Sequence, residues 1–320
     1  MRGNGQPWIP ASAAVGLLLA GLAISASAQP PGQASMAQRQ GRSDPAFSQP
    51  SIGPGTDYTV PSEAEIKAVL DRIRDHFVRN TPYRIIDTAT GMPIADLKTP
   101  TKTAGIDLKN AEFIDWTYSM GVVLSAMLHV TDVTGDPSFQ AYTFRNFDFI
   151  FEHLPYFRQQ ARLFGPQSYG YRRLIEMREL DDCGSIGAAL IRTYARKPDP
   201  KYKEGIDLAA NHILTRQPRL PDGTLARHRP VATALWIDDA YMSIPFLAQM
   251  GKMTGEARYF DDAAQQVIGM SARLFDPSKG LFDHSWFANM EEDARFYWGR
   301  GDGWVMVAMA ELLSAMPETH

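Results

Sequence analysis

Three short segments of similar pattern, about 60 residues apart, punctuate this chain. Each lies between two stretches whose apolar residues recur at helical spacing. Each also places an acid at the start of the second stretch, where the helix macrodipole favours negative charge, and an aromatic residue three positions later that can pack inward. The segments are Gly135–Phe139, Pro198–Tyr202 and Gly255–Tyr259. Their recurrence predicts a repeated helical hairpin.

Helical periodicity continues through most of the chain, and no segment alternates convincingly in the manner of a β-strand. The first helix is expected to start at a capping box of Ser62 and Glu65, because these side chains can satisfy free amides at a helix start. Several Thr, Pro and Gly residues within 81–110 predict a loop. Further helices are expected at Glu112–Val130, Ser138–Glu152, Cys183–Ala195, Lys201–Thr215, Ile237–Gly251, Ala257–Leu274 and Gly303–Ala315.

This periodicity amounts to about eight helices, or four hairpins. Stacked hairpins of this size can close into a ring of inner and outer helices. We therefore expect an all-α domain over residues 61–320. The last expected helix ends just before Pro317–His320, with no closing element after it, so the ring is expected to be incomplete.

The first 60 residues have the composition of an export signal and a linker. Arg2 precedes an apolar run over residues 11–24, and Ala26–Ala28 has the small-x-small pattern of a cleavage site. Residues 1–28 are therefore predicted to be a secretory signal peptide, too short for a comfortable membrane span, with an uncleaved anchor as the alternative. Residues 29–60, rich in Gln, Pro, Ser and Gly, are predicted to be a disordered linker. We expect an exported protein, periplasmic or extracellular, without stable membrane insertion.

Composition and motifs argue against several classes of function. The net charge is −4 and no basic stripe is present, so nucleic acid is not an expected partner. Cys183 is the only cysteine, which excludes an internal disulfide and a cysteine-based metal cluster. The seven histidines are scattered, and the sequence has no serine-hydrolase elbow, phosphate-binding loop or dinucleotide fingerprint. No metal or cofactor is therefore expected.

Two acidic pairs stand where helices are expected to begin. Asp181 and Asp182 precede a helix start rich in small residues, and helix capping is their structural interpretation. Asp238 and Asp239 lie between apolar residues of Leu235–Met242 that should otherwise be core, although they too could cap a helix. An acid on an apolar face must be paired or keep its proton, and a protonated carboxyl group can serve as a proton donor. Each pair is therefore either a cap or part of an acid–base site.

A third polar segment combines tryptophan, glycine and basic residues. It comprises Asp283–Trp286 and Trp298–Trp304. Glycine lets the backbone approach a ligand closely, and Arg300 could hold a carboxylate through two parallel hydrogen bonds. Trp298 and Trp304 could stack on a sugar ring. Surface arginines and core tryptophans are commoner, but Trp-x-Arg-Gly-x-Gly-Trp would be an unusual way to build a plain core.

Taken together in this order, these segments resemble the unsaturated rhamnogalacturonyl hydrolases of glycoside hydrolase family 105. The chain is similar, more distantly, to the unsaturated glucuronyl hydrolases of family 88. The similarity runs from about Ser62 to the C-terminus and is strongest at Leu180–Gly184, Trp236–Asp238, His284–Trp286 and Trp298–Trp304. It implies an (α/α)6 barrel of helical hairpins. Because that barrel needs six hairpins and the periodicity supplies about four, the barrel is expected to be truncated at the C-terminus.

The resemblance also implies roles for individual residues. Asp238 matches the general acid/base of the family, and Asp182 matches its second active-site aspartate. Trp236 lies beside the catalytic acid in the motif. The other positions that match substrate-binding residues are His284, Trp298, Arg300 and, less directly, His228, Arg229 and Tyr118.

The reaction implied by the resemblance uses a C4=C5 double bond left in a uronic acid by a polysaccharide lyase. Protonated Asp238 would donate to C4, and the same residue as a carboxylate would then activate a water that adds at C5. The hemiketal formed would open and expel the rest of the oligosaccharide. Asp182 would position the sugar hydroxyls, and Arg300 or Arg229 could neutralise the uronate. The expected partner is thus an unsaturated uronic-acid oligosaccharide, foremost the unsaturated galacturonyl-rhamnose unit of pectin.

Three alternatives stay open from the sequence. An unsaturated glucuronyl hydrolase would act on other lyase products, such as ulvan or glycosaminoglycan fragments. A non-catalytic sugar-binding or scaffold protein could use the same helical barrel. A sugar epimerase on such a barrel would need paired catalytic histidines, which the positions of His228 and His284 do not compel.

Overall fold

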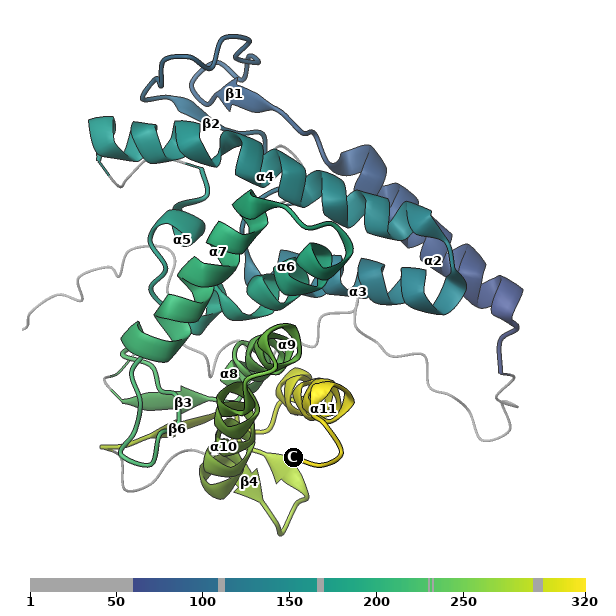
Figure 1. The fold of residues 1–320 in the computed structure, drawn as a ribbon, viewed down its shortest axis with the longest axis vertical. Coiled ribbons are helices and arrows are strands. Elements are labelled where there is room, and N and C mark those ends of the chain that lie inside the picture. The colour runs from purple at the N-terminus through teal and green to yellow at the C-terminus, as the bar shows by residue number, and fades with distance from the viewer. Residues whose placement is uncertain (1–59, 109–112, 166–169, 230, 232, 290–295) are drawn as a thin grey trace, which may run out of the picture. The chain divides into compact units, whose positions relative to one another are not determined.

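Four helices follow one another side by side and form the inner layer of the fold. Each helix of this set packs closely against the next one along the chain. A second set of helices returns along the outside, each packed against the inner helix that precedes it (Figure 1). The inner helices are α3 (Tyr118–Thr134), α6 (Gly184–Arg196), α9 (Ile244–Thr254) and α11 (Gly299–Ala315), and the outer ones are α4 (Pro137–Phe164), α7 (Pro200–Asn211) and α10 (Ala257–Leu274). This arrangement confirms the predicted helical hairpins.

The computed structural model describes residues 60–108, 113–165, 170–229, 231, 233–289 and 296–320. The expected signal peptide (1–28) lies outside the described residues, and so does the expected linker (29–60) apart from Val60. Everything described beyond Val60 belongs to one unit, Pro61–His320. None of the helices described there combines the length and the apolar character needed to cross a membrane.

The repeated segments act as predicted at the turns of the hairpins. Asp136 is the N-cap of α4 and accepts a hydrogen bond from the amide of Ser138 (2.9 Å), and Asp199 does the same for Lys201 (2.8 Å) at the start of α7. Glu256 occupies the N-cap of α10 without a side-chain bond. The following aromatic residue is buried in each case: Phe139, Tyr202 and Tyr259. Charge at the helix start and an inward aromatic three residues later thus define each hairpin.

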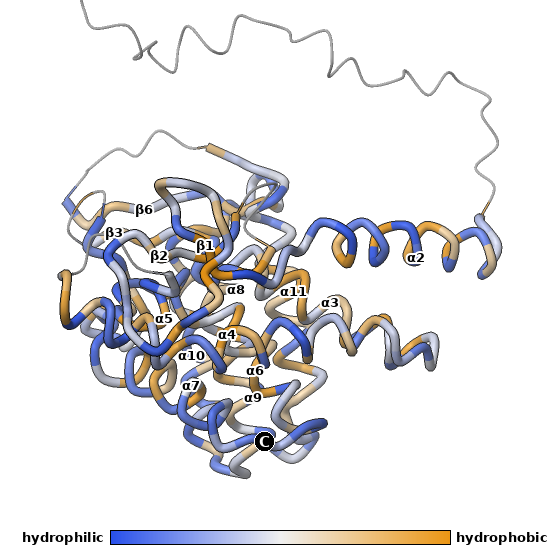
Figure 2. The backbone as a smooth tube through the Cα atoms, turned by 90° about the horizontal axis from the view of Figure 1, so that it is seen from above, coloured by the Kyte–Doolittle hydropathy of each residue, from blue (hydrophilic) through white to orange (hydrophobic). Residues whose placement is uncertain are grey.

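Helix α2 (Glu63–Asn80) starts at the predicted capping box, in which Ser62 and Glu65 satisfy each other's backbone amides. Hydrophobic and hydrophilic residues alternate around it (Figure 2). Its Lys67 and Arg74 contact the carboxylate of Asp136, at 2.9 and 3.4 Å, which joins α2 to the start of α4.

Several expected boundaries were wrong. Helix α3 begins at Tyr118 rather than Glu112, because Thr117 caps it. Helix α4 continues through Pro155 to Phe164, well past the expected end at Glu152. Its buried aromatic face continues beyond the proline, which indicates that packing outweighs the local cost of proline in a helix.

The helix expected at Ile237–Gly251 is two helices. Pro245 cannot donate an amide hydrogen, and its ring would clash with the carbonyl four residues earlier in a continuous helix. The chain therefore forms α8 (Asp238–Tyr241), turns, and starts α9 with Pro245 in its first turn. The helix expected to run to Thr215 likewise ends as α7 at Asn211 and continues as a π-helical segment, η3 (His212–Arg216).

The fold is mostly helical as expected, although three small antiparallel ladders join loops within the described residues. Each strand has only two or three residues, too few to show alternation in a sequence. The pairs are β1 (Ile85–Asp87) with β2 (Ala104–Ile106), β3 (Ala234–Trp236) with β6 (Ser285–Phe287), and β4 (Phe275–Asp276) with β5 (Leu281–Phe282). Two other short elements are the helix α5 (Arg172–Ile175) and the 3₁₀ turn η2 (Leu180–Asp182).

Close backbone packing joins the starts of the inner helices. A Cβ atom at Gly184, the first residue of α6, would lie 1.6 Å from the backbone oxygen of Met242, just before α9. One at Gly121 of α3 would lie 2.3 Å from the backbone nitrogen of Ile186. Only glycine allows these contacts. They hold the N-terminal ends of three inner helices together, and the candidate site lies at these ends.

Candidate active site

A cavity of about 700 Å³ lies at the N-terminal ends of α3 and α6. Its size suits a small ligand. Helix N-termini carry partial positive charge, which favours an anion. Five arginines and three acids line the cavity, so its charged side chains have a positive excess. The lining residues are Thr117, Tyr118, Ser119, Arg172, Arg173, Arg178, Glu179, Asp181, Asp182, Arg227, Arg229 and Trp236.

Four of the predicted site residues meet in this cavity: Tyr118, Asp182, Arg229 and Trp236. They come from segments that together span more than 100 residues of the chain. The other five predicted residues do not line it. Asp238, His284, Trp298 and Arg300 form a group that continues from Trp236, and His228 lines a neighbouring cavity of about 290 Å³ that shares Arg229.

Asp182 is held rigidly at the cavity wall. Its Oδ2 atom accepts hydrogen bonds from the amides of Arg178 (2.9 Å) and Glu179 (3.4 Å), and its Oδ1 lies 3.7 Å from Nε of Arg173. Its backbone oxygen accepts a bond from Nε1 of the fully buried Trp116 (2.6 Å). Burial raises the pKa of Asp182, and the two amides and Arg173 oppose that rise. Asp182 completes a capping box with Glu179 at the 3₁₀ turn η2, whereas α6 itself has Cys183 at its N-cap, so the capping interpretation holds for the turn and not for the helix.

Arg227 is the centre of a buried ion-pair network that the sequence did not indicate. Its guanidinium contacts both carboxylate oxygens of Asp239 (2.7 and 2.6 Å), Asp181 (2.7 Å) and Glu179 (3.4 Å). It also lies over the ring of Trp236, 4.3 Å from the ring centroid. A buried arginine with carboxylates on several sides fixes the positions of all of them.

The two acids of the second pair have different surroundings. Asp239 is fully buried, and burial raises its pKa to about 6 while the charge and hydrogen bonds of Arg227 oppose the rise. Asp238 keeps 16% of its side chain exposed, yet its Oδ2 is shielded from solvent and has no hydrogen-bond partner in the described part of the chain. That oxygen lies 3.3 Å from Nε2 of His284. Asp239 is therefore the structural member of the pair, and Asp238 is available for chemistry.

The β3–β6 ladder brings His284 to Asp238. Trp236 pairs with Ser285, and the amide of Ile237 donates to the backbone oxygen of His284 (2.9 Å). The His284 amide in turn donates to the oxygen of Phe296 (2.8 Å), which places the following Trp298 nearby. Two backbone hydrogen bonds of His284 thus bring the side chains of Asp238, His284 and Trp298 close together.

The rings of Trp236, His284 and Trp298 form a continuous row. Their centroids are 5.5 Å apart for the first pair and 5.3 Å for the second. Arg300 extends the row, because its guanidinium carbon lies 3.8 Å from the centroid of Trp298. Trp304 is elsewhere: it stacks on Tyr241 at 4.9 Å and packs against the hydrophobic core.

The residues that the sequence reasoning missed are mostly charged partners of predicted ones. Arg227 lies next to His228, and Glu179 is two residues before Asp181. The sequence has many charged residues around these positions, but it does not indicate which arginine is buried. In the part of the chain that the structure describes, no three His, Cys, Asp or Glu side chains are grouped so as to hold a metal ion.

Comparisons with known proteins show which proteins this chain is similar to. The relatives with assigned names include the unsaturated rhamnogalacturonyl hydrolase YesR of Bacillus subtilis, which is 29% identical over 142 residues, 42% of this chain and 41% of that protein. An unsaturated 3S-rhamnoglycuronyl hydrolase of an Alteromonas species is 32% identical over 88 residues, 27% of this chain and 21% of that protein. The chain thus spans less than half the length of either relative.

Solved structures show the same type of fold. The family 105 glycoside hydrolase of C. acetobutylicum is 25% identical, with a TM-score of 0.51 over 64% of this chain and 55% of that one. A possible member of family 105 from Salmonella enterica is 19% identical, with a TM-score of 0.54 over 87% of this chain and 65% of that one. These likenesses confirm the helical-barrel fold expected from the hairpin pattern. Since the model of Glycosyl Hydrolase Family 88 matches residues 93–320, most of the chain, this protein belongs to that family, within the related group that includes family 105.

Proposed function

We propose that this protein is a hydrolase that removes the unsaturated galacturonyl residue from lyase-generated rhamnogalacturonan oligosaccharides. One observation carries the proposal. Asp238 has a shielded oxygen without a hydrogen-bond partner in the described chain, and this oxygen lies 3.3 Å from Nε2 of His284. Asp238 follows Trp236, which lines the cationic cavity, by two residues. A shielded carboxyl oxygen that no donor satisfies is suited to carrying a proton that it later releases.

The proposed reaction begins with transfer of the Asp238 proton to C4 of the C4=C5 double bond. The positive charge that develops is shared by C5 and the ring oxygen. Asp238, now a carboxylate, takes a proton from a water molecule whose oxygen bonds to C5. The resulting hemiketal opens as the bond between C5 and the ring oxygen breaks, which leaves a ketone at C5 and moves the hydroxyl proton to the former ring oxygen. The hemiacetal at C1 then transfers that proton to the glycosidic oxygen, the bond between C1 and this oxygen breaks, and the oligosaccharide departs as an alcohol from an aldehyde at C1. The residue ends the cycle protonated, as it began.

The neighbouring groups suit the remaining tasks. Asp182, fixed by two backbone amides, would accept hydrogen bonds from sugar hydroxyls at the cavity wall. His284 lies beside the proton donor, and the row of Trp236, His284 and Trp298 offers flat surfaces on which a sugar ring can pack. This arrangement differs from the two carboxyl groups flanking the scissile bond in ordinary glycosidases.

A second substrate class is supported by the relatives. Two proteins that match this chain are named unsaturated 3S-rhamnoglycuronyl hydrolases, one from Alteromonas and one from Formosa agariphila. Five arginines in the cavity would suit an oligosaccharide with more than one acidic group. Unsaturated glucuronyl-rhamnose products are therefore the alternative to the pectin-derived substrate.

A substrate panel tests the proposal. The purified protein is incubated with lyase-treated rhamnogalacturonan, lyase-treated ulvan and lyase-treated glycosaminoglycan, and the ultraviolet absorbance of the C4=C5 bond is followed. We expect absorbance to fall fastest with the rhamnogalacturonan products. Faster loss with ulvan products would establish the alternative, and a stable signal with every substrate would contradict hydrolase activity.

Export of the protein is a separate prediction from residues 1–28. Cell fractionation tests it.

A further inference from the structure

The arginines that line the cavity differ in their charge pairing. Arg227 is bound to the carboxylates described above, and Arg229 is bound to Glu179, with 2.6 Å between Nε and a carboxylate oxygen. Arg172 and Arg173 of the short helix α5 line the same cavity. Their guanidinium groups lack matching hydrogen-bond acceptors in the described part of the chain.

The Arg172 side chain is half-buried in the cavity wall and forms no ion pair or hydrogen bond with any other residue that the structure describes. Arg173 lies 3.6 Å from a carboxylate oxygen of Asp115 and 3.7 Å from Asp182, too far for well-formed hydrogen bonds. Both guanidinium groups therefore keep most of their donors available. A partly buried cation without an acceptor is costly, and a ligand anion would remove that cost.

The backbone also holds this pair in place. Tyr171, which precedes Arg172, has φ 57° and ψ 30°, a left-handed conformation that is uncommon for a residue with a side chain. Its ring is buried and packs edge-on against Phe157 at 5.4 Å. Buried packing thus holds a costly backbone turn, and that turn places two consecutive arginines in the cavity wall.

We propose that Arg172 and Arg173 form an oxyanion-binding subsite for the substrate. This inference rests on the proposed function. Guanidinium groups bind carboxylate and sulfate oxygens through paired hydrogen bonds. The anion is the carboxylate of the unsaturated uronate or a sulfate ester on the adjoining sugar. The subsite lies beside Asp182, so either group would reach it from a sugar bound at the second aspartate.

Two disaccharides distinguish the sources. Both carry the same unsaturated glucuronate, and they differ only in whether the adjoining rhamnose is neutral or sulfated. In the Arg172→Gln variant we expect KM to rise about 10-fold to 100-fold, the range for losing hydrogen bonds to a charged group. A rise with both substrates assigns the uronate carboxylate, and a rise with the sulfated substrate alone assigns the sulfate ester. Unchanged KM with both overturns the subsite.

Arg162→Gln is the matched control, because Arg162 is an exposed arginine near the end of α4 that does not line the cavity. It removes the same charge and should leave KM unchanged. Arg172→Lys keeps the charge but loses the paired geometry, and should give an intermediate KM. Thermal melting confirms that each variant folds.

Calorimetry separates failure of the subsite from failure of the proposed function. Galacturonate and inorganic sulfate are titrated separately into the wild-type protein, Arg172→Gln and Arg162→Gln. Binding of either anion by wild type and Arg162→Gln, with at least about 10-fold weaker binding by Arg172→Gln, supports the subsite even if no disaccharide is hydrolysed. Equal binding by all three proteins, or no binding by wild type together with an unchanged KM, overturns it.

Discussion

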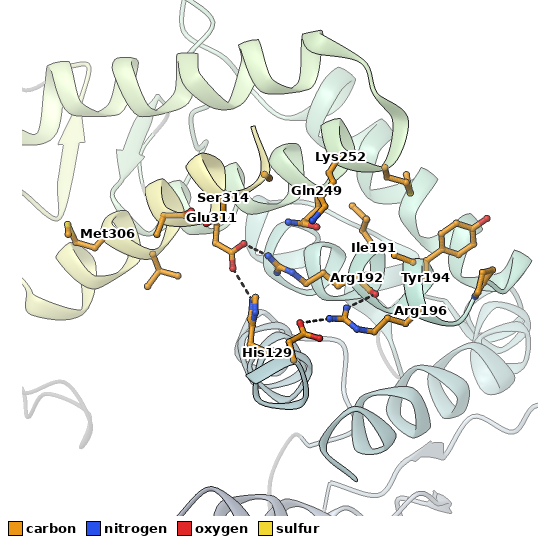
Figure 3. A pocket seen from close by; sticks show the side chains of 17 residues that line it. His129, Ile191, Arg192, Tyr194, Arg196, Gln249, Lys252, Met306, Glu311 and Ser314 are labelled. Carbon is orange, nitrogen blue, oxygen red and sulfur yellow. Dashed lines mark hydrogen bonds and ion pairs between the residues drawn. The ribbon is translucent and has the colours of Figure 1, made fainter. Parts of the chain in front are cut away.

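The two ends of the inner helices are built alike but are suited to different tasks. At the N-terminal ends, Arg227 is buried against Asp239 beside a cavity of about 700 Å³. At the C-terminal ends, Arg192 is buried against Glu311 beside a cavity of about 810 Å³, and His129 lies 3.4 Å from the same carboxylate (Figure 3). Both ends therefore combine a hollow with an arginine–carboxylate pair.

The surroundings of the pairs differ. Around Arg192 the wall includes the apolar Ile191, Met253 and Met306 beside the charged Asp132, Arg196 and Lys252, and helix C-termini give it partial negative charge. Around Arg227 stand further acids and arginines, at helix ends with partial positive charge. A buried ion pair therefore does not identify a catalytic site. Helix direction and the additional unpaired groups distinguish the end that suits an anionic sugar.

The largest effect is expected from Asp238→Asn. The amide cannot release a proton to C4, so kcat/KM should fall by about 100-fold to 10,000-fold, the usual contribution of a general acid. The melting temperature should stay near that of the wild type, because asparagine has nearly the same size and the shielded Oδ2 of Asp238, 3.3 Å from His284, makes no hydrogen bond in the described chain. Loss of the ultraviolet absorbance of the substrate measures the rate. Wild-type turnover by this variant would refute the assigned role.

Next, Asp239→Asn and Glu311→Gln compare the two ends directly. Each leaves a buried arginine without its principal carboxylate, which costs about 3 kcal/mol in the free energy of unfolding. Urea denaturation should reveal this loss in both variants. Only Asp239→Asn should also lower kcat/KM, since Arg227 packs on Trp236. Equal loss of activity in Glu311→Gln would show that the ends are not functionally distinct.

A smaller effect should come from pH, through His212 near the first of these ends. Its ring is buried and contacts Gln217 at 3.1 Å, and burial lowers its pKa below 6.5. Below pH 6.5 the unfolded chain therefore binds a proton that the folded protein resists, so the contribution of His212 to stability should fall as the pH is lowered. Asp239, whose pKa is raised, contributes with the opposite sign, so the wild type is compared with a variant at position 212. Urea midpoints between pH 7.5 and 5.5 measure this slope. His212→Gln should flatten it, and an unchanged slope would exclude His212 as its source.

The smallest effect is expected from Lys203→Met. Its partner Asp207 lies 2.5 Å away, but both side chains are substantially exposed, and such pairs contribute about 0.5 kcal/mol or less. The urea midpoint should barely move. A loss comparable to that of Asp239→Asn would mean that burial does not explain the difference between the ion pairs.

Local patterns predicted the hairpins well, because helix caps and inward aromatics act within a few residues. Asp136 and Asp199 cap their helices as expected, and α10 has the predicted bounds. The site was harder to predict. Strand β3 has three residues and pairs with a segment about 50 positions away, so no periodic signal exists for the contact that joins Asp238 to His284.

Charge partners could not be predicted for a related reason. Asp238 and Asp239 are adjacent and chemically identical, yet one is fully buried against Arg227 and the other keeps a shielded, unsatisfied oxygen. That difference arises from the direction of each side chain in the first turn of α8 and from an arginine eleven or twelve positions earlier. Motif resemblance selected Asp238, and only the three-dimensional contacts explain why its neighbour serves a structural purpose.

The contact between Gly184 and Met242 bears on how such a protein can diversify. Gly184 follows Asp182 by two residues, and Met242 follows Asp238 by four, so main-chain atoms set the spacing of the two acids. Side chains in the surrounding loops can then be exchanged without disturbing that spacing. Ligand preference could therefore change at the periphery, while any side chain introduced at Gly184 would push Met242 away and alter the spacing of Asp182 and Asp238.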